Sequence, residues 1–228
     1  MLPNSKSATM PELVVLSILA EDYAVKIPKT ADIQKVAPLL CAGITTYSPI
    51  RFSNVKKGDN VAVAGFGGLG HMALQYMVKL GAKVTVFDIT DDKKADAIRL
   101  GAVWYVNVNN PAELEGLNNQ FSFVISTIPD KYDPMMYVRM LKKGGELAVV
   151  GMPSLEKTPV VPTTFLAFAA HRKVYGSVIG GIKETQEMLD YSVKNSIYPE
   201  VKIISANQLD DAYRNVKFRY VIDVKTLK

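Results

Sequence analysis

The most regular alternation of apolar and polar residues starts near residue 60, where short apolar runs are separated by amphipathic stretches. Strands are predicted over 61–64, 83–87, 103–108, 121–128, 146–150 and 173–179. Helices are predicted between them over 69–80, 91–100, 134–141 and 163–170. Alternating strands and helices indicate an α/β fold, a doubly wound parallel sheet of about six strands with helices on both faces.

The two ends of the chain have less regular patterns. Before the sheet, an extended stretch is predicted over 23–27 and a helix over 33–40. After it, the pattern predicts a helix over 183–193, a strand over 201–204, a short helix near 209–215 and a last strand over 220–224. We expect these flanks to belong to a second domain, so the predicted division is 1–45, 46–181 and 182–228.

Composition narrows the class of protein. Hydrophobic residues make up 48% of 228 residues, enough for a full core. The net charge is +5, but the lysines are dispersed, which argues against nucleic acid as a partner. The single cysteine, Cys41, excludes an internal disulfide and fits a reducing compartment. With no secretory leader and no apolar run of transmembrane length, we expect a cytoplasmic protein without a membrane partner.

Residues 65–70 read Gly-Phe-Gly-Gly-Leu-Gly between a predicted strand and a predicted helix. In this dinucleotide-binding pattern Gly65 allows the tight turn, Gly67 lets the backbone approach a pyrophosphate, and Gly70 lets the helix pack on the strand. Gly68 and Leu69 complete the loop, and the start of the helix binds phosphates. The pattern predicts a Rossmann domain.

Asp88 closes the next predicted strand. An acid at this place accepts both ribose hydroxyls of NAD and repels the 2′-phosphate of NADP, so we expect NAD as the cofactor and NADP to be less favoured. The alternative is that Asp88 caps a helix or stands in a turn.

Four longer stretches, 37–49, 65–71, 176–188 and 219–223, resemble the zinc-containing medium-chain alcohol dehydrogenases. The resemblance is greatest to the cinnamyl-alcohol-dehydrogenase-like aldehyde reductases of bacteria, and it runs from about residue 20 to the end. It implies zinc-assisted hydride transfer between NAD(P)(H) and a primary alcohol or aldehyde.

The resemblance also assigns residues. Cys41 matches the last ligand of the family's catalytic zinc, Thr45 matches a catalytic position near the nicotinamide, and Lys93 matches a lysine near the adenosine ribose. Val150, Gly151, Ser177, Val178 and Ile179 resemble nicotinamide-side contacts, and Arg219 resembles a pyrophosphate contact. Many similar reductases have a small, hydroxyl or basic residue in place of Asp88 and prefer NADP. The family pairs its nucleotide domains through the sixth strand, so a homodimer is expected.

Family members begin with a GroES-like, β-rich catalytic domain that holds the other zinc ligands. This chain has only His71, His171 and Cys41 as histidine and cysteine ligands, and its start, 1–17, resembles nothing in the family. Catalytic zinc needs three protein ligands. We therefore expect a truncated enzyme that does not hold the zinc and that takes an alcohol or aldehyde only if the missing half is supplied.

Simpler interpretations stand beside these. Cys41 is interpreted as a small buried thiol. His71 either approaches the cofactor or caps the helix at the surface, and His171 is expected in solvent. Lys93 is alternatively a surface charge, and Thr45 and its neighbour Thr46 are alternatively caps at a helix start. The nine methionines are expected to fill the core.

The favoured function is a truncated alcohol dehydrogenase or aldehyde reductase that keeps cofactor binding; whether this chain alone is an enzyme stays open. The alternative is a non-catalytic dinucleotide-binding or oligomerisation module. A zinc-free reductase of the quinone-reductase type is disfavoured by residues 39–43, which include Cys41. A methyltransferase is disfavoured by Arg219 and the long family motifs. The sequence does not identify the substrate.

Overall fold

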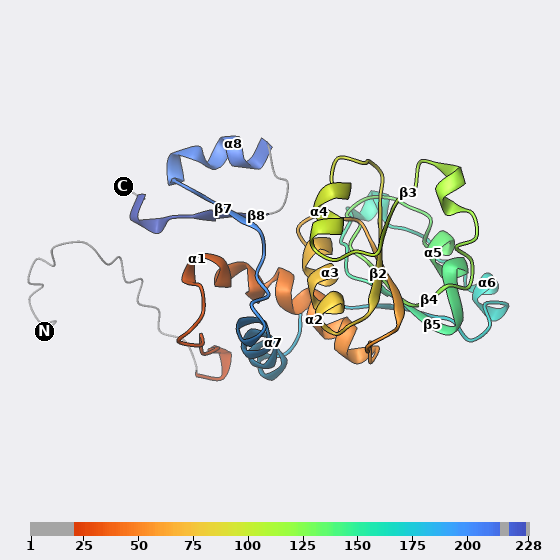
Figure 1. The fold of residues 1–228 in the computed structure, drawn as a ribbon, viewed down its shortest axis with the longest axis horizontal. Helices are drawn as coiled ribbons and strands as arrows, with labels where there is room; N and C mark the ends of the chain where they lie inside the picture. The colour runs from red at the N-terminus through yellow and green to blue at the C-terminus, as the bar shows by residue number, and fades with distance from the viewer. Residues whose placement is uncertain (1–20, 215–218, 227–228) are drawn as a thin grey trace, which may run out of the picture.

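The computed structural model describes residues 21–214 and 219–226, and its central element is a six-stranded parallel sheet (Figure 1). The strands are β1 (Asn60–Ala64), β2 (Lys83–Asp88), β3 (Trp104–Asn107), β4 (Phe121–Ser126), β5 (Leu141–Val149) and β6 (Lys173–Gly176). Their order is β3-β2-β1-β4-β5-β6. This order confirms the predicted doubly wound fold, in which ligands bind at the carboxyl ends of the strands near the switch point between β1 and β4.

Helices cover both faces of the sheet, as predicted (Figure 1). One core lies under α2 (Ala42–Phe52), α3 (Gly70–Lys79), α4 (Lys94–Arg99) and α7 (Ile182–Lys194), and the other under α5 (Pro134–Met140) and α6 (Thr163–Ala167). Strand β1 contributes to both, because Val61 and Val63 point into the first core and Ala62 and Ala64 into the second. A strand buried on both faces explains the continuous apolar run.

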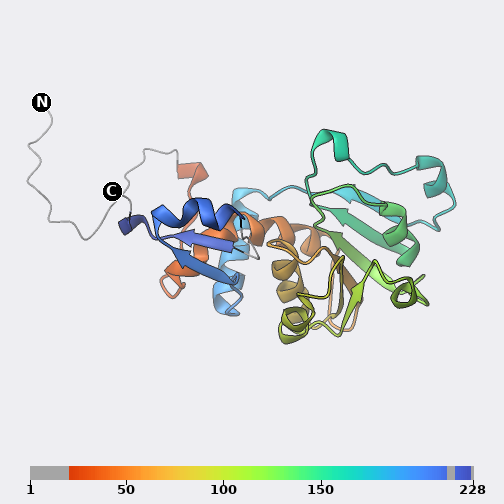
Figure 2. The same ribbon diagram turned by 90° about the horizontal axis from the view of Figure 1, so that it is seen from above.

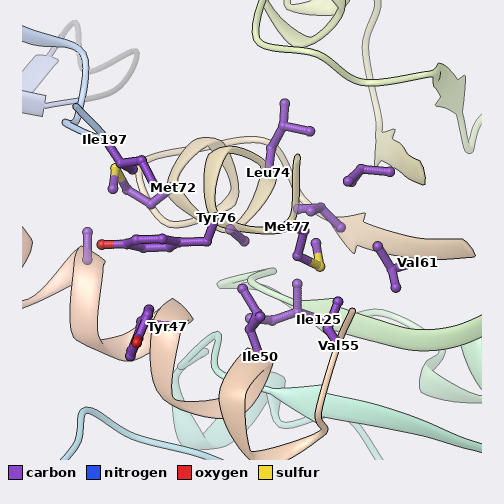
Figure 3. Packing of buried hydrophobic residues seen from close by; sticks show 14 of the residues in the cluster. Tyr47, Ile50, Val55, Val61, Met72, Leu74, Tyr76, Met77, Ile125 and Ile197 are labelled. Atoms are coloured by element: carbon purple, nitrogen blue, oxygen red, sulfur yellow. The ribbon is translucent and has the colours of Figure 1, made fainter. Parts of the chain in front are cut away.

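The first core is built around the contact between α2 and α3. Figure 3 shows Tyr47 and Ile50 of α2 facing Tyr76 and Met77 of α3. The rings of Tyr47 and Tyr76 meet edge to face with their centroids 5.4 Å apart. The Tyr76 hydroxyl lies 2.7 Å from the Ser192 hydroxyl of α7, so this buried hydroxyl has a hydrogen-bond partner.

A smaller unit stands beside the main sheet (Figure 2). Strands β7 (Val201–Ile204) and β8 (Arg219–Ile222) form a two-stranded parallel sheet, with Val201 opposite Arg219. Helix α8 (Leu209–Arg214) connects them, and α1 (Ile33–Val36) lies in the same part of the molecule. Within the described ranges, the structure contains no helix with the length and apolar character needed to cross a membrane.

Several predicted boundaries were wrong. Strand β5 starts at Leu141 and runs through Gly144, although the strand was predicted to start only at residue 146; the register with β4 shifts at this point, as in a β-bulge. Strand β6 ends at Gly176, before the predicted end at residue 179. The predicted helix 33–40 divides into α1 and a 3₁₀ helix, Ala37–Leu40, which has Pro38 in its first turn.

Two further expectations concern the flanks. The extended stretch predicted over 23–27 forms no strand, and Glu21–Tyr23 is a 3₁₀ turn. The start of the chain, 1–17, and the predicted helix end at Asn215 lie outside the described residues.

Candidate functional site

The turn from β1 into α3 has glycines at two positions where the backbone or its neighbours disfavour a side chain. Gly65 has a φ of +87°, a conformation that side chains disfavour. A Cβ on Gly70 would stand 2.0 Å from the Gly65 carbonyl oxygen. The Thr127 hydroxyl, just after β4, donates to the same carbonyl at 2.8 Å. The loop is thereby fixed from both sides.

Gly67 differs from these two glycines, because a Cβ added there would meet no atom within 4 Å. Packing inside this chain therefore does not require glycine at this position. Open space beside the start of α3 is what the close approach of a pyrophosphate needs, since the first N–H groups of a helix attract anions. Gly68 and Leu69 continue this loop and are half-buried.

Asp88 lies at the carboxyl end of β2 and faces the glycine loop. Its Oδ2 accepts the Phe66 N–H at 2.9 Å, and its Oδ1 accepts the Ile89 N–H at 2.7 Å. The Lys93 Nζ lies 3.2 Å from the same Oδ2. Only 8% of Asp88 is exposed, so this carboxyl group is buried and paired with Lys93.

These contacts exclude one alternative interpretation of each of these two residues. Helix α4 begins at Lys94 with Lys93 at its N-cap position, so Asp88 does not cap it. Lys93 is not a plain surface charge, because its ammonium group is paired with Asp88 and its side chain is mostly buried.

Five other predicted residues follow β5 and β6 at the same edge of the sheet. The Gly151 N–H donates to the Ser126 carbonyl at 3.1 Å, and the Ser177 N–H donates to the Val149 carbonyl at 3.0 Å. Val150 is buried, whereas Val178 and Ile179 are more than half exposed. Because the carboxyl ends of parallel strands meet at one edge, these residues share that edge with Gly65 and Asp88.

His71 is buried, so the expectation of a cap at the surface was wrong. Its Nδ1 lies 3.2 Å from the Gly67 carbonyl, and its Nε2 lies 3.2 Å from the backbone nitrogen of Glu200. Burial lowers the pKa of His71 to about 4. The ring is therefore neutral near pH 7.

Arg219 starts β8, beside the end of the linker from α7. Its Nε is buried and has no hydrogen-bond partner within the part of the chain that the structure describes. A buried guanidinium N–H without a partner costs free energy, which an anionic ligand would recover.

Cys41 is exposed, which overturns the expectation of a buried thiol. It immediately precedes α2, a helix that sequence analysis did not predict. Among residues 21–214 and 219–226, no three histidine, cysteine, aspartate or glutamate side chains gather as metal ligands would. His171 is exposed, as predicted.

Thr45 is buried in the first half of α2. The neighbouring Thr46 hydroxyl donates to the Ala42 carbonyl at 2.8 Å, so it does not act as an N-cap.

Two residues of the site escaped the sequence analysis. Thr127 follows an apolar strand directly, and the rule that strand ends meet at one edge would have identified it. Glu200 carries no such signal, because it contacts His71 from 129 positions away.

The chain is similar to several known proteins. Residues 68–194 match the family described as zinc-binding dehydrogenase. The chain is 39% identical over 215 residues to the probable formaldehyde dehydrogenase of Bacillus subtilis, covering 92% of this chain and 61% of that protein. It is 38% identical over 216 residues to an NADP-dependent alcohol dehydrogenase C of Mycolicibacterium smegmatis, with the same two coverages.

A solved structure is similar too. The crystal structure of CAD from Helicobacter pylori complexed with NADP(H) superposes with a TM-score of 0.84 at 48% identity, covering 90% of this chain and 59% of that one. The chain thus spans about 60% of the length of the relatives it matches.

Proposed function

Because the chain belongs to the zinc-binding dehydrogenase family, we propose that it binds a nicotinamide dinucleotide as the cofactor-binding part of an alcohol dehydrogenase or aldehyde reductase. The observation that carries this proposal is the loop 65–70. Gly70 is required by the close approach of α3 to Gly65, whereas Gly67 faces open space where only a ligand would require glycine. Relatives named for alcohol dehydrogenase activity and NADP support it.

The proposed dinucleotide lies along the carboxyl edge of the sheet. Its pyrophosphate meets the N–H groups of Gly67, Gly68, Leu69 and Gly70 after the turn at Gly65, and Arg219 supplies a positive charge. The adenosine ribose lies at Asp88 and Lys93. The nicotinamide lies beside Val150, Gly151, Ser177, Val178 and Ile179, with Thr45 on its catalytic side.

We further propose that NAD is preferred over NADP. Asp88 is a buried carboxylate where the 2′-phosphate of NADP would lie, and like charges in a partly buried site repel by a few kcal/mol, on the order of a hundredfold in affinity. Two observations argue against this preference for NAD. Lys93 already pairs with Asp88. One similar protein is named NADP-dependent, and another has a crystal structure in complex with NADP(H).

Calorimetric titration of the full chain with NADH and NADPH separates these cofactors. We expect NADH to bind about tenfold more tightly or better, and Asp88→Ser to remove that preference. Equal or tighter NADPH binding by the wild-type chain would contradict this preference and would show that Lys93 or Lys94 captures the 2′-phosphate. Lys94→Gln is the control for Asp88→Ser and should keep the preference for NADH, because Lys94 is exposed and forms no ion pair with Asp88.

The described residues do not fit a catalytic zinc. Cys41 is exposed at the start of α2, and no second and third ligand lie near it in the described ranges. We therefore derive no chemical step through zinc from this chain. Cys41 remains proposed as a zinc ligand only together with ligands from outside the described residues.

A second candidate is a non-catalytic dinucleotide-binding or oligomerisation module. The position of Cys41 favours it, because no second and third zinc ligand lie near this residue in the described ranges. With added zinc, such a module binds NADH yet oxidises no primary alcohol. Zinc-dependent turnover together with stoichiometric zinc would exclude it.

The proposed homodimer has one specific support. Exposed apolar side chains recur along the connection from β5 to β6, which is an edge strand; they are Met152, Leu155, Val160, Phe165 and Phe168. Light scattering by the full chain tests whether the homodimer forms.

The division at residues 45 and 181 also stays a proposal, and α2 runs across the first boundary. A cytoplasmic location is proposed from the single cysteine.

A further inference from the structure

Glu200 connects the small β7–β8 sheet to the dinucleotide domain. Its backbone N–H points at the Nε2 of His71, 3.2 Å away, and its Oε1 lies 2.6 Å from the Nη2 of Arg99. Strand β7 begins at the next residue, Val201. The start of β7 is therefore held against α3 and α4 by two contacts of one residue.

The other nitrogen of the His71 ring reaches the glycine loop. A carbonyl only accepts and a backbone N–H only donates, so Nδ1 carries the proton toward Gly67 and Nε2 accepts from Glu200. A single neutral tautomer satisfies both contacts. His71 thus joins the loop proposed to hold phosphates to the start of β7, and it does so from a buried position.

Strand pairing connects Glu200 to Arg219. Val201 pairs with Arg219 in the β7–β8 register, so fixing Glu200 also fixes the start of β8. The charge of Arg219 helps to lower the pKa of His71, which is expected when the guanidinium lies near the ring. The Arg219 Nε is buried without a partner in the described residues, as an N–H reserved for an anion would be.

We propose that His71 is a positioning residue, which holds Arg219 at the loop 65–70 through Glu200 and Val201 so that Arg219 meets the pyrophosphate of the cofactor. This inference rests on the proposed dinucleotide binding. His71 itself does not touch the cofactor. Replacing His71 should weaken the binding of ligands that carry a pyrophosphate. It should leave the binding of adenosine, which has no pyrophosphate, unchanged.

The test is a double-mutant cycle on the full chain, read by calorimetry with NADH and with adenosine as a competitor. Arg219→Gln should weaken NADH binding about tenfold or more, since it removes a charge-assisted contact. His71→Leu should weaken it about as much. The double variant should be no weaker than Arg219→Gln alone, because His71 acts through Arg219. Adenosine affinity should stay within about twofold throughout.

His71→Gln is the rescue variant, because its amide keeps one donor and one acceptor. It should retain NADH affinity within about threefold of the wild type. Three outcomes would each overturn the inference. The losses of NADH affinity could add in the double variant, adenosine affinity could fall as much as NADH affinity, or His71→Gln could bind NADH as weakly as His71→Leu.

Folding is controlled separately. Should His71→Leu fail to melt cooperatively, Arg99→Gln replaces it in the cycle, since the Arg99 side chain is 53% exposed and releases the other contact of Glu200. Arg99→Gln should weaken NADH binding less than His71→Leu, and it should weaken it no further when combined with Arg219→Gln. An additive loss of NADH affinity would contradict the inference. A wild-type chain that binds no NADH defeats the proposed function instead, so the two failures are distinguishable.

Discussion

The Gly65 carbonyl oxygen lies 2.0 Å from the point where a Cβ of residue 70 would stand. Gly70→Ala must therefore push α3 away from β1, and we expect the free energy of unfolding to fall by about 3 kcal/mol. Urea denaturation measures this change. Gly67→Ala is the matched control in the same loop, because its Cβ would meet nothing within 4 Å. A Gly70→Ala chain as stable as the control would contradict the close packing of α3.

The buried, neutral His71 ring should make stability depend on pH. Its pKa is about 4 in the folded chain against an ordinary value of 6.5, so above pH 6.5 neither state binds the proton. Between pH 6.5 and pH 4, His71 binds a proton in the unfolded chain but not in the folded chain. Stability therefore falls by up to about 1.4 kcal/mol per pH unit until pH 4.

Urea denaturation at pH 7.5 and pH 5 measures this effect as the difference between the wild type and His71→Gln. We expect the wild type to lose about 2 kcal/mol more than the variant, since other groups titrate equally in both. Identical losses would mean that the His71 ring is not held neutral.

The β7–β8 sheet should open more easily than the main sheet. Two short strands bury little surface, and Lys202 and Ile203 of β7 are exposed, whereas Val61 to Ala64 of β1 are fully buried. Hydrogen exchange should therefore be faster in 201–204 and 219–222 than in 61–64. Equal protection in a monomeric sample would contradict this expectation.

The sequence predicted the sheet well where local pattern decides structure. The apolar run before Gly65 and the helix-forming run after Gly70 identify β1 and α3 from neighbouring residues alone. The family matches likewise confirm the resemblance that the motifs indicated.

Other parts needed the tertiary structure. Helix α2 has Pro49 within it and is buried on nearly all sides, so it lacks the amphipathic period of a surface helix. The burial of His71 depends on Glu200, which is remote in sequence, and the ion pair that covers Asp88 depends on where α4 begins. Cys41 stands at the N-cap position of α2 and is exposed, although cysteine is usually buried.

Dinucleotide binding at the loop 65–70 is tested most directly by calorimetric titration of NADH into Gly67→Ala and the wild type. The added methyl group leaves the fold undisturbed, since it meets no atom of the chain within 4 Å, yet it occupies the space proposed for the pyrophosphate. We predict that the wild type binds NADH and that Gly67→Ala binds it at least about tenfold more weakly, with unchanged unfolding by urea. NADH binding of equal strength by both proteins would contradict the proposed site.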